Sequence, residues 1–222
     1  MSATIVSVRV SDPAPAWKDL GFAVEDGTTT VGSIRFELGA EDGDAGVLSW
    51  RLFSPMAGEA GQRLVDGLPT ELVDDPGAAG PAPPHPNGAV VLDHLVVRTP
   101  DFARTLAALG ALGLEPRRLR PPDQVRPVEM AFFRLGEAIL EVVGPTEAPA
   151  GAEGEPARFS GLAFTVADLE ASATLLGDRL GRPRDAVQPG RRIATVDRGA
   201  GARAPIAFLT VDPRQAGRAG GR

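Results

Sequence analysis

The sequence predicts an α+β fold in which paired βαβββ modules form a curved mixed sheet around a cavity, with a reduced, related unit at the N-terminus. Two observations favour this class. Residues 93–113 and 160–181 are similar to each other, and a stretch with five prolines, DPGAAGPAPPHPNG, separates them from the first third of the chain. The length of 222 residues is sufficient for one large domain or two small ones with a buried core.

The two similar segments each predict a strand followed by a helix. DHLVVRTPDFARTLAALGALG aligns with SGLAFTVADLEASATLLGDRLG, which places Asp101 on Asp168. An apolar, β-rich run opens each copy, and an Asp then stands where a helix N-cap is expected. In the first copy, two further strands meet at Leu135-Gly136-Glu137, a tight hairpin. The second copy continues with RRIATVD and APIAFLTVDP, so both units are interpreted as βαβββ.

The first third of the chain contains a weaker copy. TIVSVRVSD, a short helix in PAPAWKDLG and the strands of TTTVGSIRFELG follow the same order, and GVLSWRLFSP with GEAGQRLVDGLPTELV predicts a strand and a helix from half of a fourth unit. The predicted organisation is therefore a reduced unit at 1–75, a proline-rich linker at 76–89, two full modules at 90–213 and a flexible tail at 214–222.

Composition excludes several classes of function. Acidic residues exceed basic ones, 29 to 23, which argues against a nucleic-acid partner. The absence of cysteine excludes disulfides, thiol nucleophiles and thiolate metal sites. No apolar run is long enough to cross a bilayer, so we expect a cytoplasmic protein with no membrane partner. The sequence also lacks G-x-S-x-G, P-loop and H-E-x-x-H motifs.

The paired units, with DHLVV opening one and FFRLGEAILEVVGP closing it, resemble the vicinal oxygen chelate superfamily. This superfamily includes glyoxalases, bleomycin resistance proteins, extradiol dioxygenases and methylmalonyl-CoA epimerases. The resemblance covers residues 90–213 well and 1–75 faintly. It implies two modules around one cavity, with a divalent metal (Zn, Fe, Mn or Ni) held by residues of the first and last strand of each module. In the central module those places fall on His94 and Glu141.

The last module departs from this pattern. Gly161 stands at the place of His94, and Leu209 stands at the place of Glu141. Half of the ligand set implied by the resemblance is therefore missing, and two protein ligands rarely hold a catalytic divalent ion. Glu37 supplies a third ligand only if the N-terminal module faces the central one, and there Ile5 stands at the histidine place.

Strand alternation gives an independent reason to group these residues. His94 and Arg98 share one face of their strand, and Glu141, within the apolar string AILEVVG, needs a partner or solvent if it points inward. Arg98 can clamp a carboxylate, or can form an outward salt bridge instead. His94 can equally be a core histidine paired with Glu141.

A Pro-Gly turn at AVQPGRRIATV offers further donors to an anionic ligand from Gln188, Arg191 and Arg192, although a plain surface turn explains the same pattern. His85, in the proline-rich linker, is expected to be solvated.

The sequence leaves three functions open. The first is a small-molecule-binding protein with a degenerate metal site. The second is an active lyase, isomerase or dioxygenase that depends on a divalent metal. The third is a structural or partner-binding protein without a ligand pocket. A homodimer is a further expectation, because the resemblance implies that modules can pair across subunits.

Overall fold

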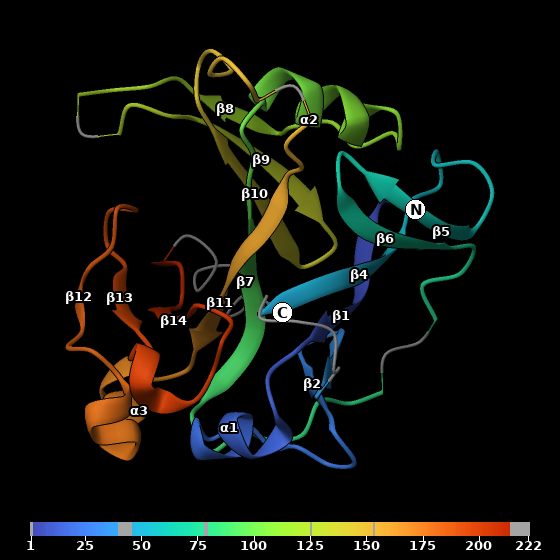
Figure 1. Ribbon diagram of the computed structural model, residues 1–222. Coiled ribbons are helices and arrows are strands. Elements are labelled where there is room, and N and C mark those ends of the chain that lie inside the picture. The colour runs from blue at the N-terminus through green and yellow to red at the C-terminus, as the bar shows by residue number, and fades with distance from the viewer. Residues whose placement is uncertain (1, 40–45, 78–79, 125, 153, 214–222) are drawn as a thin grey trace.

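The computed structural model describes residues 2–39, 46–77, 80–124, 126–152 and 154–213. These residues form two mixed β-sheets that pack against each other, with short helices near the ends of the sheets (Figure 1). No helix within these ranges is long and apolar enough to cross a membrane. The predicted tail at 214–222 lies outside the described residues.

The first sheet has the strand order β2-β3-β1-β4-β6-β5, and the second has the order β12-β13-β14-β11-β7-β10-β9-β8. The first sheet and its helix consist of β1 (Thr4–Val10), α1 (Ala14–Asp19), β2 (Thr28–Val31), β3 (Ile34–Leu38), β4 (Val47–Phe53), β5 (Gly61–Val65) and β6 (Leu68–Val73). The second sheet and its helices consist of β7 (Ala89–Arg98), α2 (Phe102–Gly110), β8 (Arg118–Arg120), β9 (Glu129–Leu135), β10 (Ala138–Gly144), β11 (Arg158–Val166), α3 (Leu169–Leu176), β12 (Arg184–Asp185), β13 (Arg192–Thr195) and β14 (Ile206–Thr210).

The second sheet confirms the predicted fold class. In each module the first strand runs parallel to the last, β7 with β10 and β11 with β14, and the two modules meet where β7 pairs antiparallel with β11. The predicted hairpin is present, with Gly136 at φ 64° between β9 and β10. Asp101 and Asp168 cap α2 and α3 by accepting hydrogen bonds from backbone N–H groups of the first helical turn.

The first sheet repeats this plan with fewer strands. β1 is parallel to β3, β4 is parallel to β6, and β1 pairs antiparallel with β4. The helix predicted within GEAGQRLVDGLPTELV is wrong, because the segment forms the β5–β6 hairpin. Its turn residues, Asp66 and Gly67, have φ angles of 49° and 85°, and an Asp-Gly pair is typical of such two-residue turns.

Aromatic side chains fill the space between the sheets. Trp17 of α1 and Phe36 of β3 have ring centroids 5.9 Å and 5.4 Å from that of Phe164 on β11. Leu95 and Val97 of β7 are also fully buried in this core. The face of the second sheet that carries these residues therefore packs on the first sheet, and the opposite face, called the open face below, is left for other contacts.

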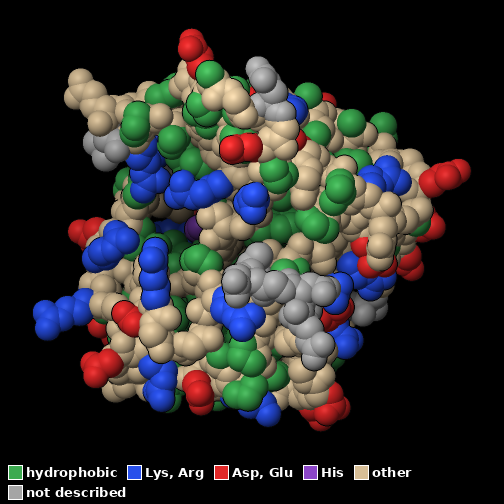
Figure 2. Space-filling view, viewed as in Figure 1, with side chains coloured by type: hydrophobic (Ala, Val, Ile, Leu, Met, Phe, Trp, Pro, Cys, Tyr) green, Lys and Arg blue, Asp and Glu red, His purple; other side chains and the backbone are tan. Residues whose placement is uncertain are grey.

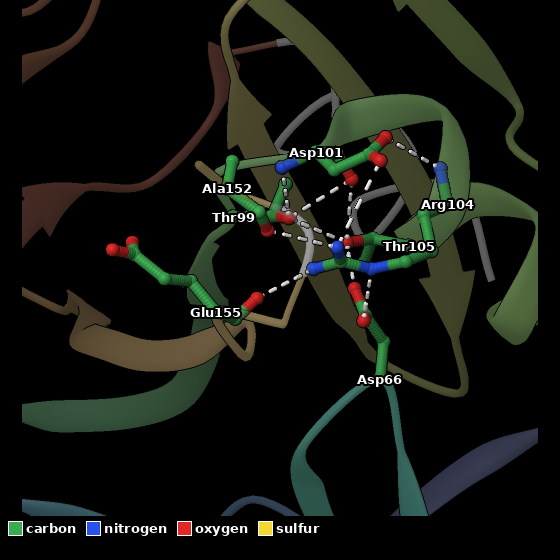
Figure 3. Close-up of polar contacts among 7 residues, drawn as sticks. All are labelled: Asp66, Thr99, Asp101, Arg104, Thr105, Ala152 and Glu155. Atoms are coloured by element: carbon green, nitrogen blue, oxygen red, sulfur yellow. Dashed lines mark hydrogen bonds and ion pairs between the residues drawn. The ribbon is translucent and has the colours of Figure 1, made fainter. Parts of the chain in front are cut away.

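A second contact between the sheets involves the β5–β6 turn and the N-terminus of α2 (Figure 3). The Arg104 Nε–H donates to Asp66 Oδ1 at 2.6 Å, and the Thr105 hydroxyl donates to the same carboxylate. Arg104 also donates to the backbone oxygens of Ala152 and Glu155. One guanidinium thus joins the hairpin of the first sheet to the loop between β10 and β11.

His85 is buried, so the expectation that it is solvated is wrong. Its Nδ1 accepts a hydrogen bond from the Ala23 N–H at 3.1 Å, and its Nε2 lies 3.0 Å from the Thr30 carbonyl oxygen. Because a carbonyl only accepts and Nδ1 is already accepting, the imidazole is neutral with its proton on Nε2. Burial lowers the pKa of His85, and the hydrogen bond to Thr30 opposes this only in part.

We expect this histidine to make the fold less stable in weak acid. Below its ordinary pKa of 6.5, the unfolded chain takes up a proton that folded His85 resists. The free energy of unfolding should then fall by at most about 1.4 kcal/mol per pH unit. Urea unfolding at pH 7.5 and 5.5 measures the drop. This drop in stability should be smaller in His85→Gln and unchanged in His94→Gln. An equal drop in the two variants would contradict its assignment to His85.

Candidate functional site

The open face of the second sheet carries the imidazole and the carboxylate singled out in the sequence. His94 of β7 pairs with Ile139 of β10. Two residues further along each strand, Val96 pairs with Glu141. Directly paired residues share a face, so His94 and Glu141 point to the same side of the sheet, as strand alternation requires. No hydrogen bond joins these two side chains in the described structure.

Asp93, which the sequence analysis did not single out, is the actual partner of His94. β7 has an irregularity here: His94 pairs with Ala163 but Leu92 pairs with Phe164, so Asp93 is an extra residue in the strand. Such a bulge lets two consecutive side chains point to one face. The Asp93 carboxylate therefore reaches the open face, where its Oδ1 lies 2.9 Å from His94 Nδ1.

This contact fixes which nitrogen of the His94 imidazole carries the proton. An ionised carboxylate only accepts hydrogen bonds, so His94 Nδ1 must carry the proton that it donates to Asp93. His94 Nε2 makes no hydrogen bond within the described residues, and the His94 side chain is 22% exposed. The free nitrogen is thus available to a ligand.

A buried arginine holds Asp93 from the other side. Arg191 is only 4% exposed, and its Nη2 donates to Asp93 Oδ2 at 2.6 Å. The Thr165 hydroxyl donates to the same oxygen at 2.8 Å. Burial acts to raise the pKa of Asp93, but the hydrogen bonds from His94 and Arg191 and the charge of Arg191 outweigh it and hold the pKa well below its ordinary value.

The three residues that the sequence analysis singled out in the Pro-Gly turn have different partners in the structure. Arg191 is the partner of Asp93, and Gln188 supports it by accepting from Arg191 Nη1 while donating to Asp212. Arg192 does not join them. Its guanidinium pairs with Glu170 of α3, on the side of the sheet that faces the helix.

Further arginines surround this group on the open face. Figure 2 shows a hollow in the region of β7, β9 and β13, with Lys or Arg side chains on its rim and a His side chain at its floor. Strand pairing places the following arginines on the open face: Arg98 and Arg158, which pair with each other; Arg118, which pairs with Phe132; Arg120, which pairs with Met130; Arg134, which pairs with Ile139; and Arg184, which pairs with Ile193. Arg120 is paired with Asp123. The remaining arginines still outnumber the two carboxylates near the floor, Asp93 and Glu141, so this face favours anions.

The structure also decides which module faces the central one. β7 pairs with β11 of the last module, whereas Glu37 lies on the first sheet, where its carboxylate is 3.9 Å from Arg9 Nε. Glu37 is therefore on the wrong sheet to complete a metal site with His94 and Glu141.

The side chains near His94 do not fit a divalent metal. Among the described residues, no three or more His, Cys, Asp or Glu side chains are grouped so that they could hold an ion. Asp93, the carboxylate next to His94, is already bound to the Arg191 guanidinium, which repels a second cation. A catalytic divalent ion usually needs three protein ligands.

No family model and no curated protein matches the sequence. Among solved structures, the chain is similar to methylmalonyl-CoA epimerase from Mycobacterium tuberculosis, at 17% identity and a TM-score of 0.45, over 59% of this chain and 93% of that one. It is also similar to the Streptomyces coelicolor methylmalonyl-CoA epimerase in complex with 2-nitronate-propionyl-CoA, at 18% identity and a TM-score of 0.44, over 56% and 96%. A hypothetical protein from Bacillus halodurans matches at 16% identity and a TM-score of 0.44, over 55% and 94%. At these identities, the likeness concerns the arrangement of strands and helices and not the residues of a site.

Proposed function

We propose that the open face of the second sheet binds a small organic anion, and that His94 and Glu141 are the remainder of a degenerate metal site. The observation that carries the proposal is the excess of arginines over carboxylates around His94. Arg98, Arg134 and Arg158 have no ion-pair partner within the described residues, so their guanidinium groups are available for carboxylate or phosphate oxygens.

The side chains at the floor of the hollow orient the ligand. Arg191 keeps Asp93 ionised, Asp93 fixes the His94 tautomer, and His94 Nε2 then accepts a hydrogen bond from a protonated group of the ligand. The alternative of a metal-dependent lyase, isomerase or dioxygenase has no such support, because the donor set near His94 does not fit the metal.

Isothermal titration with citrate, malonate and the uncharged malonamide tests the binding. We expect the two carboxylates to bind and malonamide not to bind. Arg134→Gln should weaken carboxylate binding about tenfold, which corresponds to ~1.4 kcal/mol. Arg192→Gln is the matched control, because it removes an arginine that is paired with Glu170 away from the open face. Equal affinities in the two variants, or no binding by the wild type, would contradict the proposal.

Metal analysis of protein purified without chelator tests the second part of the proposal, that the metal site is degenerate. We expect no divalent metal close to one equivalent per chain. A stoichiometric metal that is lost in both His94→Ala and Glu141→Ala would instead favour the metal-dependent enzyme. A melting curve of each variant shows that the loss is local and not a consequence of unfolding.

A further inference from the structure

A carboxylate without a partner lies in the middle of the open face. Glu141 of β10 is half-buried, and it forms no ion pair and no hydrogen bond within the described residues. Its cross-strand neighbours are apolar, with Val96 of β7 on one side and Phe132 of β9 on the other. Taking a carboxylate out of water costs free energy unless a cation or a hydrogen-bond donor compensates it. Glu141 therefore needs a cationic or donating group that its neighbours on the sheet do not supply.

The matching carboxylate of the first sheet does have a cation beside it. Glu37 of β3 stands at the same place in its module as Glu141, on the strand that runs parallel to the first strand. Glu37 is directly paired with Arg9 of β1, whose Nε lies 3.9 Å from the carboxylate. Val96 occupies the place of Arg9 in the second sheet, so the open face lacks this internal cation next to Glu141.

Two arginines flank Glu141 along a diagonal of the open face. Arg98 lies on β7, two residues beyond Val96, and Arg134 lies on β9, paired with the residue two positions before Glu141. Neighbouring strands are about 4.8 Å apart and each residue advances about 3.3 Å, so each arginine Cα is about 8 Å from the Glu141 Cα, in opposite directions. The charges along this diagonal therefore run positive, negative, positive.

A pair of like charges marks one end of this diagonal. Arg158 of β11 pairs directly with Arg98, and both side chains are exposed without an ion-pair partner in the described part of the chain. Like charges directly opposite each other on a sheet are destabilising. An anion held between the two guanidinium groups relieves their repulsion, because each planar fork can bind carboxylate oxygens.

The balance of charge around Glu141 determines what a ligand must carry. Asp93 is compensated by Arg191, so it adds no free charge. A ligand that carries carboxylates alone satisfies the arginines but is repelled by Glu141. A ligand with an ammonium group between two carboxylates matches the whole diagonal and still has a net negative charge.

We infer that the open face selects an amino dicarboxylate, in which a cationic nitrogen lies between two carboxylates. One carboxylate binds Arg98 and Arg158, and the other binds Arg134. The ammonium donates to Glu141 and to His94 Nε2. This inference rests on the proposed function, and it adds to it a class of ligand and a role for Glu141 in specificity.

L-Glutamate and glutarate, which differ in the amino group, are the probes for isothermal titration of the full chain. We expect glutamate to bind at least tenfold more tightly than glutarate. Glu141→Gln, which keeps the side-chain shape, should weaken glutamate binding at least tenfold and should strengthen glutarate binding, because it removes the charge that attracts the ammonium and repels a dicarboxylate. Glu37→Gln is the matched control and should leave both affinities unchanged, because this carboxylate is on the first sheet.

A melting curve separates a binding role of Glu141 from a structural one. Because Glu141 has no partner among the described residues, Glu141→Gln should not lower the melting temperature. A lower melting temperature together with an unchanged preference for glutamate would assign Glu141 to the fold and overturn the inference.

Three further outcomes decide between this inference and the proposed function. Binding of 2-hydroxyglutarate as tight as that of glutamate would show that a hydroxyl suffices, and would overturn the requirement for an ammonium. Equal binding of glutamate and glutarate, or binding of citrate without glutamate, would overturn the inference and leave the proposed function intact. If none of these anions binds, both are wrong.

Discussion

Arg191→Ala is expected to lower the free energy of unfolding by about 3 kcal/mol, because it leaves a largely buried carboxylate without its cation. The Asp93 side chain is 16% exposed and its Oδ2 is 2.6 Å from Arg191 Nη2. Arg191 also donates to the Thr210 carbonyl oxygen at 2.8 Å, so the substitution removes a link from β7 to β14 as well. Urea unfolding at pH 7 measures the loss.

Arg192→Ala is the matched control, since it removes the neighbouring arginine from an exposed ion pair with Glu170. Exposed pairs of this kind contribute at most about 1 kcal/mol. Similar losses of stability in Arg191→Ala and Arg192→Ala would show that the Asp93–Arg191 pair contributes no more than an exposed ion pair.

The pH dependence of the free energy of unfolding in acid should reveal the contribution of the same Asp93–Arg191 pair. The pKa of folded Asp93 is below its ordinary value of 3.8, so the stability it contributes is present above that value and is lost as the pH falls through the folded pKa. Because Arg191 is one cause of the lowered pKa, the acid-dependent part of the stability should shrink in Arg191→Ala. An unchanged acid profile between pH 5 and pH 2 would contradict the assignment.

Asp12→Ala should cost about 3 kcal/mol, because it leaves buried donors without an acceptor. The Asp12 carboxylate is fully buried and accepts from Trp17 Nε1 at 2.9 Å and from the backbone N–H groups of Arg203 and Ala204 at 2.6 Å and 3.1 Å. Asp12 follows β1 of the first sheet, whereas residues 203–204 precede β14 of the second. Loss of this acceptor should therefore loosen the contact between the sheets. Tryptophan emission in a Trp50→Phe background, where only Trp17 remains, reports it during urea unfolding.

Two substitutions calibrate this prediction. Asp12→Asn keeps one acceptor oxygen for the backbone donors, so its cost should be smaller than that of Asp12→Ala. Asp197→Ala removes a carboxylate that caps an exposed 3-10 turn by accepting from the Gly199 N–H, and it should cost about 1 kcal/mol. A cost for Asp12→Ala no larger than that for Asp197→Ala would show that Asp12 does not hold the sheets together.

Local sequence patterns predicted most elements of the second sheet and their order, although the two-residue strand β12 was not predicted. The alternation of apolar residues in AILEVVG, the glycine at the turn before it, and Asp101 and Asp168 at the helix starts all act within a few residues of the chain. For the same reason, the shared face of His94 and Glu141 was predictable. The β5–β6 hairpin was missed although its Asp66-Gly67 turn was visible, because the apolar spacing of the segment also suits a helix.

The partners of these side chains depend on residues that are distant in the sequence. A bulge in β7 turns Asp93 to the open face, and pairing of β7 with β11 brings Thr165 and Arg191 to it across 72 and 98 positions. His85 is held by Ala23 and by Thr30 of β2, although its immediate neighbours in the chain are prolines. The sequence by itself therefore determined the modules and the candidate imidazole and carboxylate. Only the tertiary structure decided that the imidazole is held by an ion pair and surrounded by arginines, because strand register and contacts between the sheets are set by packing over the whole chain.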